Sequence, residues 1–249
     1  MKPYRHALLL LRRELRLDDN TALLEACRNS DRISLGFILD PRQIGKHRWR
    51  SLPGMAFMLE SLRLLHDELA GRGSGIHFIK AEASEGLARL VQRTGCDAVF
   101  ANRDYSPFAL KRDAELSTAC QAAGIPFHLA DDVLLHQPGS ILTAQGTPYQ
   151  VFTPFYRTAL KTPVPAPRAF NHWSKLHPMR PEEQTAGRAL LGDLHILASP
   201  IAAGRDGAIA IVQQLPSFAA YAQQRDIPGL DASTHLSTHL KFGTLSARE

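Results

Sequence analysis

Residues 6–40 read HALLLLRRELRLDDNTALLEACRNSDRISLGFILD and contain two short apolar runs on either side of a helical segment. The run His6–Leu11 is typical of a buried strand and ends at the charged RRELRLDDN. Asn20 can cap a helix that continues to about Asn29, and Ile33–Leu39 is a second buried run. The segment therefore predicts a strand–helix–strand unit, from which parallel sheets are built.

The same alternation continues to about residue 130. Further strands are expected at Ile76–Ala81, Ala98–Ala101 and Pro126–Leu129, and further helices at Pro53–Leu69, Ser84–Thr94 and Leu110–Ala123. Continuously apolar strands that alternate with helices of ten or more residues indicate a sheet covered on both faces. We therefore predict that residues 1–130 form a doubly wound α/β domain with a mostly parallel, five-stranded sheet.

Composition narrows the class of protein. The chain has 249 residues, a net charge of +5 and 44% hydrophobic residues, as expected of a globular protein with a full core. Its three scattered cysteines form no CxxC pair, which favours a reducing compartment. No run approaches the length of a membrane helix, so we expect a cytoplasmic protein without a membrane partner.

Charged side chains follow several predicted strands, where ligands of such sheets bind. They are Arg12, Arg13 and Glu14 after the first strand, Asp40 after the second, and Asn102, Arg103 and Asp104 after the fourth. No GxGxxG or GxxxxGK[ST] motif is present, so a dinucleotide or P-loop site is not supported. Arg12, Arg13 and Arg16 could hold an anion, but a solvated charged turn is the commoner explanation. Solvation is also the expectation for the Arg103-Asp104-Tyr105 and Lys111-Arg112-Asp113 clusters.

The character of the sequence changes after residue 130. Residues 131–200 are rich in proline and carry little sustained periodicity, which predicts an irregular connector with short helical pieces such as Pro154–Leu160. Helical spacing resumes at Gly204. Residues 201–249 are therefore interpreted as the start of a helical domain.

Four hydroxyl residues, Ser233, Thr234, Ser237 and Thr238, crowd into the last part of the chain ahead of a possible helix. This pattern is compatible with an ordinary helix cap and also with a phosphate-binding turn. His235 and His239 have a spacing that can bind a metal, but no Glu lies between them and no third ligand is evident. We therefore expect no metal site.

Three motifs in this order resemble the DNA photolyase and cryptochrome family. LLRRELRLDDNTAL (10–23) is similar to the family's opening strand–turn–helix motif, although Leu10-Leu11 replaces an aromatic pair and Glu14 replaces Asp. PYQVFTPFYR (148–157) resembles the inter-domain signature. YAQQRDIPGLDASTHLSTHLKFGTLSARE (221–249) resembles the beginning of the FAD-binding domain.

The resemblance assigns roles to particular residues. Tyr221 corresponds to a tyrosine that contacts FAD, and Arg225 to an arginine associated with the DNA phosphate backbone. The segment Ser233, Thr234, His235, Leu236 and Ser237 corresponds to the turn that holds the flavin diphosphate, with His235 in place of a common Arg. No catalytic residue is assigned within these 249 residues.

The resemblance also implies a second, antenna chromophore in the α/β domain. Phe108-Ala109 stands where folate-binding members have Asn-Glu, so folate is disfavoured, and a deazaflavin, FMN or no antenna stay open. The hydrophobic residues from Tyr105 to Phe108 could wall such a ring.

The function implied by the resemblance is light-driven repair of cyclobutane pyrimidine dimers in damaged DNA, by electron transfer from photoexcited reduced FAD. A cryptochrome-type photoreceptor and a non-catalytic chromophore-binding module are the alternatives. Most of the family's flavin domain lies outside these 249 residues, so we expect this polypeptide alone to bind FAD weakly or not at all and to be inactive. We also expect Leu236, Leu240 and Leu245 to lack the helices against which they would pack, so that this end is the least ordered helical part of the chain. We expect a monomer.

Overall fold

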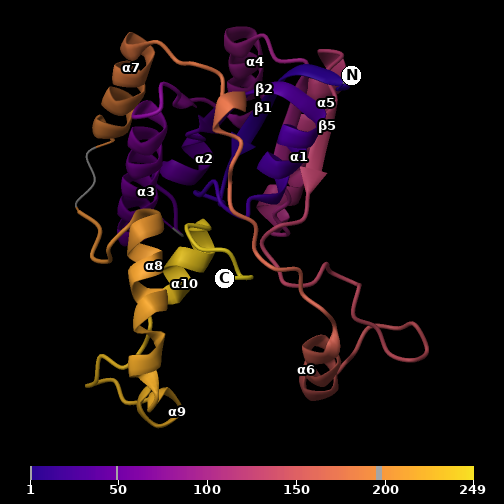
Figure 1. The fold of residues 1–249 in the computed structure, drawn as a ribbon, viewed down its shortest axis with the longest axis vertical. Helices are drawn as coiled ribbons and strands as arrows, with labels where there is room; N and C mark the ends of the chain where they lie inside the picture. Colours follow the sequence, from indigo (N-terminus) through magenta and orange to yellow (C-terminus); the bar gives the residue numbers. More distant parts are fainter. Residues whose placement is uncertain (1, 49, 195–197) are drawn as a thin grey trace.

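The computed structural model describes residues 2–48, 50–194 and 198–249, and its centre is a parallel sheet with the strand order β3-β2-β1-β4-β5 (Figure 1). The strands are β1 (Tyr4–Leu11), β2 (Ser30–Ile38), β3 (Ile76–Ile79), β4 (Ala98–Asn102) and β5 (Phe127–Ala130). The predicted doubly wound fold is confirmed. Because β1 pairs with β2 on one side and with β4 on the other, the strand order reverses between β1 and β4.

Helices cover both faces of the sheet and extend beyond it. They are α1 (Thr21–Asn29), α2 (Pro41–Ile44), α3 (Leu52–Ala70), α4 (Ala83–Thr94), α5 (Pro107–Ala122), α6 (Phe152–Lys161), α7 (Pro181–Gly192), α8 (Gly204–Gln214), α9 (Tyr221–Gln224) and α10 (Leu236–Phe242), with short 3₁₀ turns η1 (Trp173–Lys175) and η2 (Leu215–Phe218). None of the described helices is long and apolar enough to cross a membrane.

The alternation of side chains along β1 divides the core in two. Leu9 and Leu11 point to the face covered by α1 and α3, and Leu8 and Leu10 point to the face covered by α4 and α5. All four leucines are buried. This explains why polar and apolar residues do not alternate along the strand.

Helix α5 begins earlier than the sequence pattern indicates. It starts at Pro107 instead of Leu110, because Ser106 caps it by accepting a hydrogen bond from the Ala109 N–H at 3.3 Å. Proline is well suited to the first helical position, where its missing N–H is not needed. The earlier start places Phe108 and Arg112 one turn apart on the same helix.

The proline-rich connector packs back on the α/β domain. The main chain of His177 donates to the Ile33 carbonyl at 2.7 Å, and the Trp173 ring lies against the Arg72 guanidinium at 3.8 Å. Helix α7 then covers the edge strand β3, where Gly187 lies against the Phe78 ring. Contact with the sheet edge explains how an irregular segment of this length is held in place.

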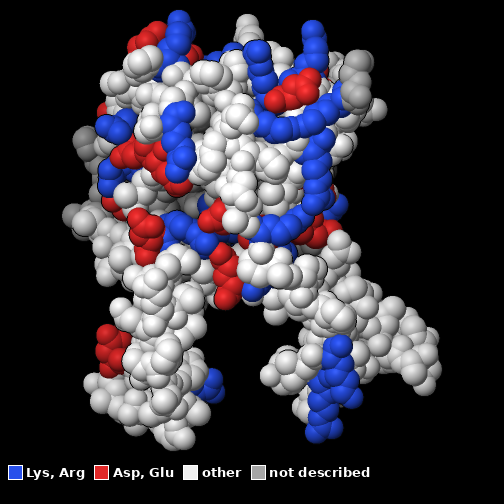
Figure 2. Space-filling model, in the orientation of Figure 1, with Lys and Arg blue, Asp and Glu red and all other residues white. Residues whose placement is uncertain are grey.

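Two arms extend from the body of the molecule, one formed by α6 and the other by α8 and α9 (Figure 1). Figure 2 shows that charged side chains gather mainly on the body, while the arms are mostly uncharged. Helix α6 has no buried residue, and Phe152 is 72% exposed. The inter-domain signature therefore leads into a projecting helix that exposes aromatic side chains together with Arg157 and Lys161.

The C-terminal segment is firmly packed, contrary to the sequence-based expectation. Leu245 is only 5% exposed, so the expectation that it lacks packing partners is wrong, although Leu240 is largely exposed. Ser246 contacts the Asp19 carboxylate, and Arg248 Nε lies 2.7 Å from the same group. The turn after β1 supplies these partners, a long-range contact that periodicity does not reveal.

The partly buried histidine His77 on β3 predicts a pH dependence of stability. Burial lowers its pKa from 6.5 to about 4, which Glu183 opposes and Arg93, His177 and His6 reinforce. The folded state therefore binds fewer protons than the unfolded state, and stability falls as the pH drops from about 6.5 towards 4. His77→Gln should flatten this slope, measured as the urea midpoint at several pH values. His172→Gln, at an exposed histidine, is the control. If stability depends on pH equally in His77→Gln and in His172→Gln, the prediction is contradicted.

Candidate functional site

A cavity of about 620 Å³ lies at the carboxyl ends of β1 and β2, next to the reversal in strand order. Its walls come from the turn after β1, from α2 and α3, from the start of α5, and from the end of α10. Cavities of this size hold small organic ligands, and this edge of a doubly wound sheet is where they bind. The fold thus places a ligand-sized pocket at the expected edge.

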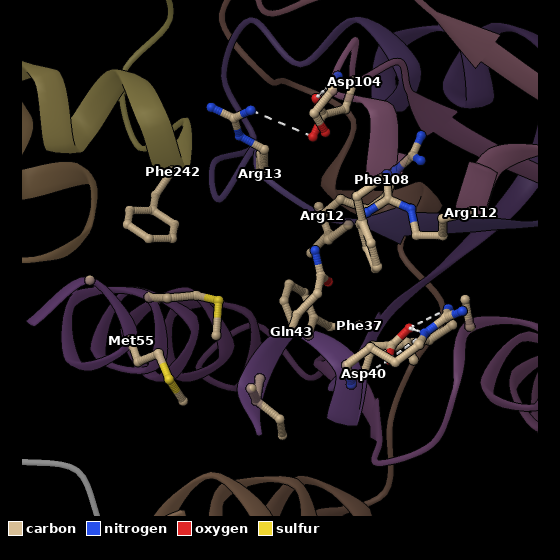
Figure 3. Close-up of a pocket in the computed structure, with 18 of the residues that line it drawn as sticks. Arg12, Arg13, Phe37, Asp40, Gln43, Met55, Asp104, Phe108, Arg112 and Phe242 are labelled. Carbon is tan, nitrogen blue, oxygen red and sulfur yellow. Dashed lines mark hydrogen bonds and ion pairs between the residues drawn. The ribbon is translucent and has the colours of Figure 1, made fainter. Parts of the chain in front are cut away.

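One side of the pocket is apolar. Met55 and Met58 on α3, Phe37 on β2 and Phe242 on α10 contribute their side chains. Figure 3 shows Phe242 and Met55 on one side of the cavity, away from most of the arginines. Flexible methionines and flat aromatic rings make a surface that suits a planar ring system.

The opposite side contains buried arginines. Arg12 contacts the Asp113 carboxylate and the Asn102 carbonyl, and Arg112 lies 3.1 Å from the same Asp113 oxygen. Burial and the neighbouring Arg112 lower the pKa of Arg12, but an arginine stays protonated at any physiological pH. The expectation of solvated charges is therefore wrong at Arg12, at Arg16 and at Arg112-Asp113, because all four side chains are less than 10% exposed.

The remaining charged groups of the pocket form looser pairs. Arg13 lies 3.5 Å from Asp104, whose pKa burial would raise but which the Ser106 N–H and Arg13 together lower. Arg42 binds Asp40 at 2.7 Å and Glu115 at 3.2 Å. The side chains of Arg13 and Arg42 are 41% and 31% exposed, so these two ion pairs lie near the opening of the pocket.

Helix α10 closes one end of the pocket. The Leu15 N–H donates to the Phe242 carbonyl at 3.0 Å, and Arg13 Nε donates to the Lys241 carbonyl at 2.9 Å. The Phe57 ring on α3 packs against Phe242, with ring centroids 5.5 Å apart. Residues separated by more than 180 positions in the chain therefore complete one cavity.

The sequence-predicted ligand groups divide into two sets. Arg12, Arg13, Asp40 and Asp104 line the pocket, whereas Glu14, Asn102 and Arg103 do not. Glu14 accepts the Arg12 and Arg13 main-chain N–H groups, Asn102 binds Ala22 and Asn20, and Arg103 pairs with Asp131. Burial raises the pKa of Glu14. This second set holds the turns in place.

Sequence reasoning did not assign Arg112, Met58, Lys241 or Phe242 to a ligand site. The one available signal was the spacing of Phe108 and Arg112 on α5, which places both on one helical face. The contribution of α10 has no local signal, because it depends on how the C-terminal segment docks. Of the predicted wall Tyr105–Phe108, Ser106 and Phe108 line the pocket but Tyr105 and Pro107 do not, and the Tyr105 hydroxyl donates to Asp131 instead.

The residues predicted to bind FAD lie outside this pocket. Tyr221 is on α9, at the end of the α8–α9 arm, whereas Ser233–Ser237 lie at the start of α10 (Figure 1). Helix α10 begins at Leu236, and its cap is His235 in the left-handed conformation with φ 53°. The His235 side chain does not cap the helix, but the Thr234 hydroxyl accepts the Leu236 N–H at 3.4 Å, so one member of the hydroxyl cluster contacts the first turn of α10.

The predicted DNA contact and the two histidines have local partners. Arg225 lies 5.7 Å from the Tyr221 ring centre and 3.6 Å from Asp226. His235 binds Asp231 at 2.9 Å, while the buried His239 binds Thr244 at 2.8 Å. The two histidines therefore do not share a partner.

Comparisons with known proteins agree with one another. The DNA photolyase family model matches residues 7–169. A deoxyribodipyrimidine photo-lyase of Synechococcus sp. is 31% identical over 250 residues, which cover 96% of this chain and 51% of that protein.

Solved structures give the same result. An archaeal photolyase from Sulfolobus tokodaii, described with two FAD molecules, matches 98% of this chain and 53% of its own with a TM-score of 0.83 and 31% identity. A class III photolyase from Agrobacterium tumefaciens matches 97% of this chain and 51% of its own with a TM-score of 0.78 and 25% identity. The chain spans about half the length of these relatives. With its sheet, its connector and its helical C-terminal segment all matched, the chain belongs to the DNA photolyase family.

Proposed function

We propose that the pocket at the carboxyl edge of the sheet holds an antenna chromophore, which passes absorbed light to an FAD-dependent photolyase. The observation that carries this proposal is the pairing of an apolar wall, Met55, Met58 and Phe242, with a polar wall in a cavity of about 620 Å³. A planar conjugated ring can lie against the apolar wall while its polar substituents face the arginines. A folate is disfavoured, because Phe108-Ala109 replaces the Asn-Glu pair of folate-binding members.

We further propose that FAD binds through Tyr221 and through Ser233, Thr234, His235, Leu236 and Ser237. The hydroxyls of Ser233 and Ser237 have no hydrogen-bond partner among the described residues, and the N-cap residue His235 makes no side-chain cap bond to α10. These free donors fit the oxygens of a diphosphate. FAD, when bound, supplies light-driven electron transfer; the chain's own part is to orient it. Arg225, which is 53% exposed, is proposed to contact the DNA backbone.

The activity proposed for the complete protein is repair of cyclobutane pyrimidine dimers in DNA, as in the photolyases that it resembles. Expression of the gene and measurement of dimers in irradiated DNA, under blue light and in darkness, tests this activity. Loss of dimers only under blue light is expected. A protein that holds FAD but clears no dimers would instead be a cryptochrome-type photoreceptor.

Binding of a flavin ring tests the pocket directly. Titration of the protein with riboflavin, followed by its fluorescence, should show saturable binding. Phe242→Leu should weaken this binding about two- to tenfold, because the substitution removes an aromatic contact worth about 0.5–1.5 kcal/mol.

The matched control is Phe152→Leu, which alters an exposed aromatic residue on α6, outside the pocket. Equal affinities for the two variants would place the ring elsewhere. No saturable binding by the unaltered protein would reject the pocket as a flavin-type chromophore site.

A further inference from the structure

Three segments that are far apart in the sequence meet at Asp19, in the turn after β1. Its side chain is 1% exposed, and its backbone has φ 50°, a left-handed conformation that costs free energy at a residue other than glycine. Such a conformation persists only where the surrounding structure holds it. The partners of Asp19 therefore show what this part of the fold is built to keep in place.

The proline-rich connector and the C-terminal segment both bind Asp19. The Asp19 N–H donates to the Arg168 carbonyl at 2.7 Å, and its carboxylate accepts the Arg168 N–H at 3.2 Å. Arg248 Nε donates to the other carboxylate oxygen at 2.7 Å, and the Ser246 hydroxyl contacts the same oxygen. We call residues 243–249 the C-terminal strap, because these contacts tie the segment to the turn after β1.

Arg248 also reaches a second buried carboxylate. Its guanidinium lies 3.2 Å from one oxygen of Asp132, and Arg16 binds the other oxygen at 2.6 Å. Two arginines and two carboxylates thus alternate, with side chains that are at most 11% exposed. The formal charges balance, so the cluster has no excess charge for a ligand. A buried ion pair is weak evidence for stability, but in some proteins it specifies one arrangement of the chain.

The arrangement fixed here includes one wall of the pocket. The strap begins directly after Phe242, and Arg16 donates to the Gly243 carbonyl at 3.0 Å. One residue earlier on both segments, the Leu15 N–H donates to the Phe242 carbonyl at 3.0 Å. Arg13, which also lines the pocket, lies on the same turn (Figure 3). The turn and the strap are therefore held together all the way from the pocket to Asp19.

We propose that Asp19 and Arg248 are positioning residues of the pocket, which hold the Phe242 ring at the spacing from the turn that a planar chromophore requires. Neither residue lines the cavity, so each acts through the strap. The inference rests on the proposed antenna site and adds the part of the fold that controls its width. It gives the buried cluster a role in binding as well as in folding.

Arg248→Gln tests this role and leaves neither buried carboxylate without a partner. Asp132 keeps Arg16, and Asp19 keeps the Ser246 hydroxyl and the Arg168 N–H. Riboflavin affinity should fall at least about threefold, because a less firmly held Phe242 must be ordered when the ring binds. Arg248→Lys, which keeps the charge beside Asp19, should lose less affinity than Arg248→Gln.

Val99→Ala is the control for a loss of stability alone. Val99 is buried on β4 and does not line the pocket. The deletion of two buried methyl groups lowers stability, but riboflavin affinity should stay within about twofold.

A double variant shows whether Arg248 acts through Phe242. In a Phe242→Leu background, Arg248→Gln should weaken riboflavin binding by less than about twofold, because the ring that it positions is already absent. A residue that only stabilises the fold would reduce affinity by the same factor in both backgrounds.

Hydrogen exchange measures the same effect without a ligand. The Leu15 N–H is bonded to the Phe242 carbonyl, so in Arg248→Gln it should exchange at least about tenfold faster relative to the N–H groups of β1. In Val99→Ala this ratio should not change.

The outcomes separate the two proposals. Unchanged riboflavin affinity or an unchanged exchange ratio in Arg248→Gln overturns the positioning role and leaves the antenna site standing. An equal loss of affinity with and without Phe242→Leu overturns it as well. If the unaltered protein binds no riboflavin, the antenna site and the positioning role are both rejected. Circular dichroism shows that each variant is folded before affinities are compared.

Discussion

Arg16→Met is expected to lower the free energy of unfolding by about 3 kcal/mol, one of the two largest effects that we predict. The Arg16 side chain is 2% exposed, and its guanidinium lies 2.6 Å from the fully buried Asp132 carboxylate. It also donates to the Asp19 and Gly243 carbonyls at 2.8 and 3.0 Å. Removal of this cation leaves a buried carboxylate with weaker partners.

The remaining partners of Asp132 limit the loss. The Thr21 N–H and hydroxyl bind its first oxygen at 2.9 and 2.8 Å, and Arg248 lies 3.2 Å away. We therefore expect the lower end of the range of about 3–5 kcal/mol seen when one partner of a buried ion pair is removed. Urea unfolding at pH 7 measures the change.

The effect should also depend on pH in a defined direction. Burial would raise the pKa of Asp132, but Arg16 and Thr21 together lower it, so its ionised form stabilises the fold above the pKa of the unfolded chain. This stabilisation is lost as the pH falls through the lowered, folded-state pKa. Arg16→Met should therefore cost less in acid than at pH 7, because a protonated Asp132 needs no cation.

Two controls make this prediction specific. Arg89→Met, at an exposed pair on α4, should change stability by less than about 1 kcal/mol. The double variant Arg16→Met with Asp132→Asn should be less destabilised than the sum of the single variants. If the loss of stability in the double variant equals the sum of the two single losses to within about 0.5 kcal/mol, Arg16 and Asp132 are not coupled.

The sequence predicts the sheet well, because the patterns that indicate its strands and helices are formed by residues close together in the chain. The apolar runs at β1 and β2 and the helical spacing of α1 each depend on residues that are close in the chain. Of the residues that follow the strand ends, Arg12, Arg13, Asp40 and Asp104 line the pocket, since parallel strands bring their carboxyl ends to one edge, whereas Glu14, Asn102 and Arg103 do not.

The rest of the pocket could not be predicted, because it depends on contacts between distant segments. Arginine side chains usually lie on the protein surface. Arg12 and Arg112 are buried only because α5 packs across the end of β1. Phe242 reaches the pocket because α10 docks on the turn after β1. A charged residue near a turn is usually solvated, and here packing against the C-terminal segment and α5 overrides that tendency.

Gly243→Ala is the second substitution for which we expect a large effect. Gly243 ends α10 with φ 59° and ψ 28°, and a β-carbon there would collide with the Arg13 carbonyl and lie 2.6 Å from the Glu14 Cα. The neighbours are main-chain atoms and cannot rotate away. We expect a loss of about 2–4 kcal/mol, from left-handed strain and from overpacking.

Gly95→Ala is a closely matched control for this substitution. Gly95 ends α4 with φ 63° and ψ 29°, and nothing lies within 4 Å of its β-carbon position. The same backbone strain is therefore present without the collision, so Gly95→Ala should cost about 1 kcal/mol. The difference between the two variants, measured by urea unfolding, isolates the contact between α10 and the turn after β1.

The collision should also affect the pocket. Displacement of α10 moves Lys241 and Phe242, which line the cavity, and weakens the bond from the Leu15 N–H to the Phe242 carbonyl. Riboflavin binding should therefore weaken in Gly243→Ala and not in Gly95→Ala, at a temperature where both are folded. Equal stability costs and equal affinities in the two variants would mean that α10 does not dock on the turn through Gly243. The close approach of these two main-chain segments therefore links the stability of the C-terminal segment to the shape of the proposed chromophore site.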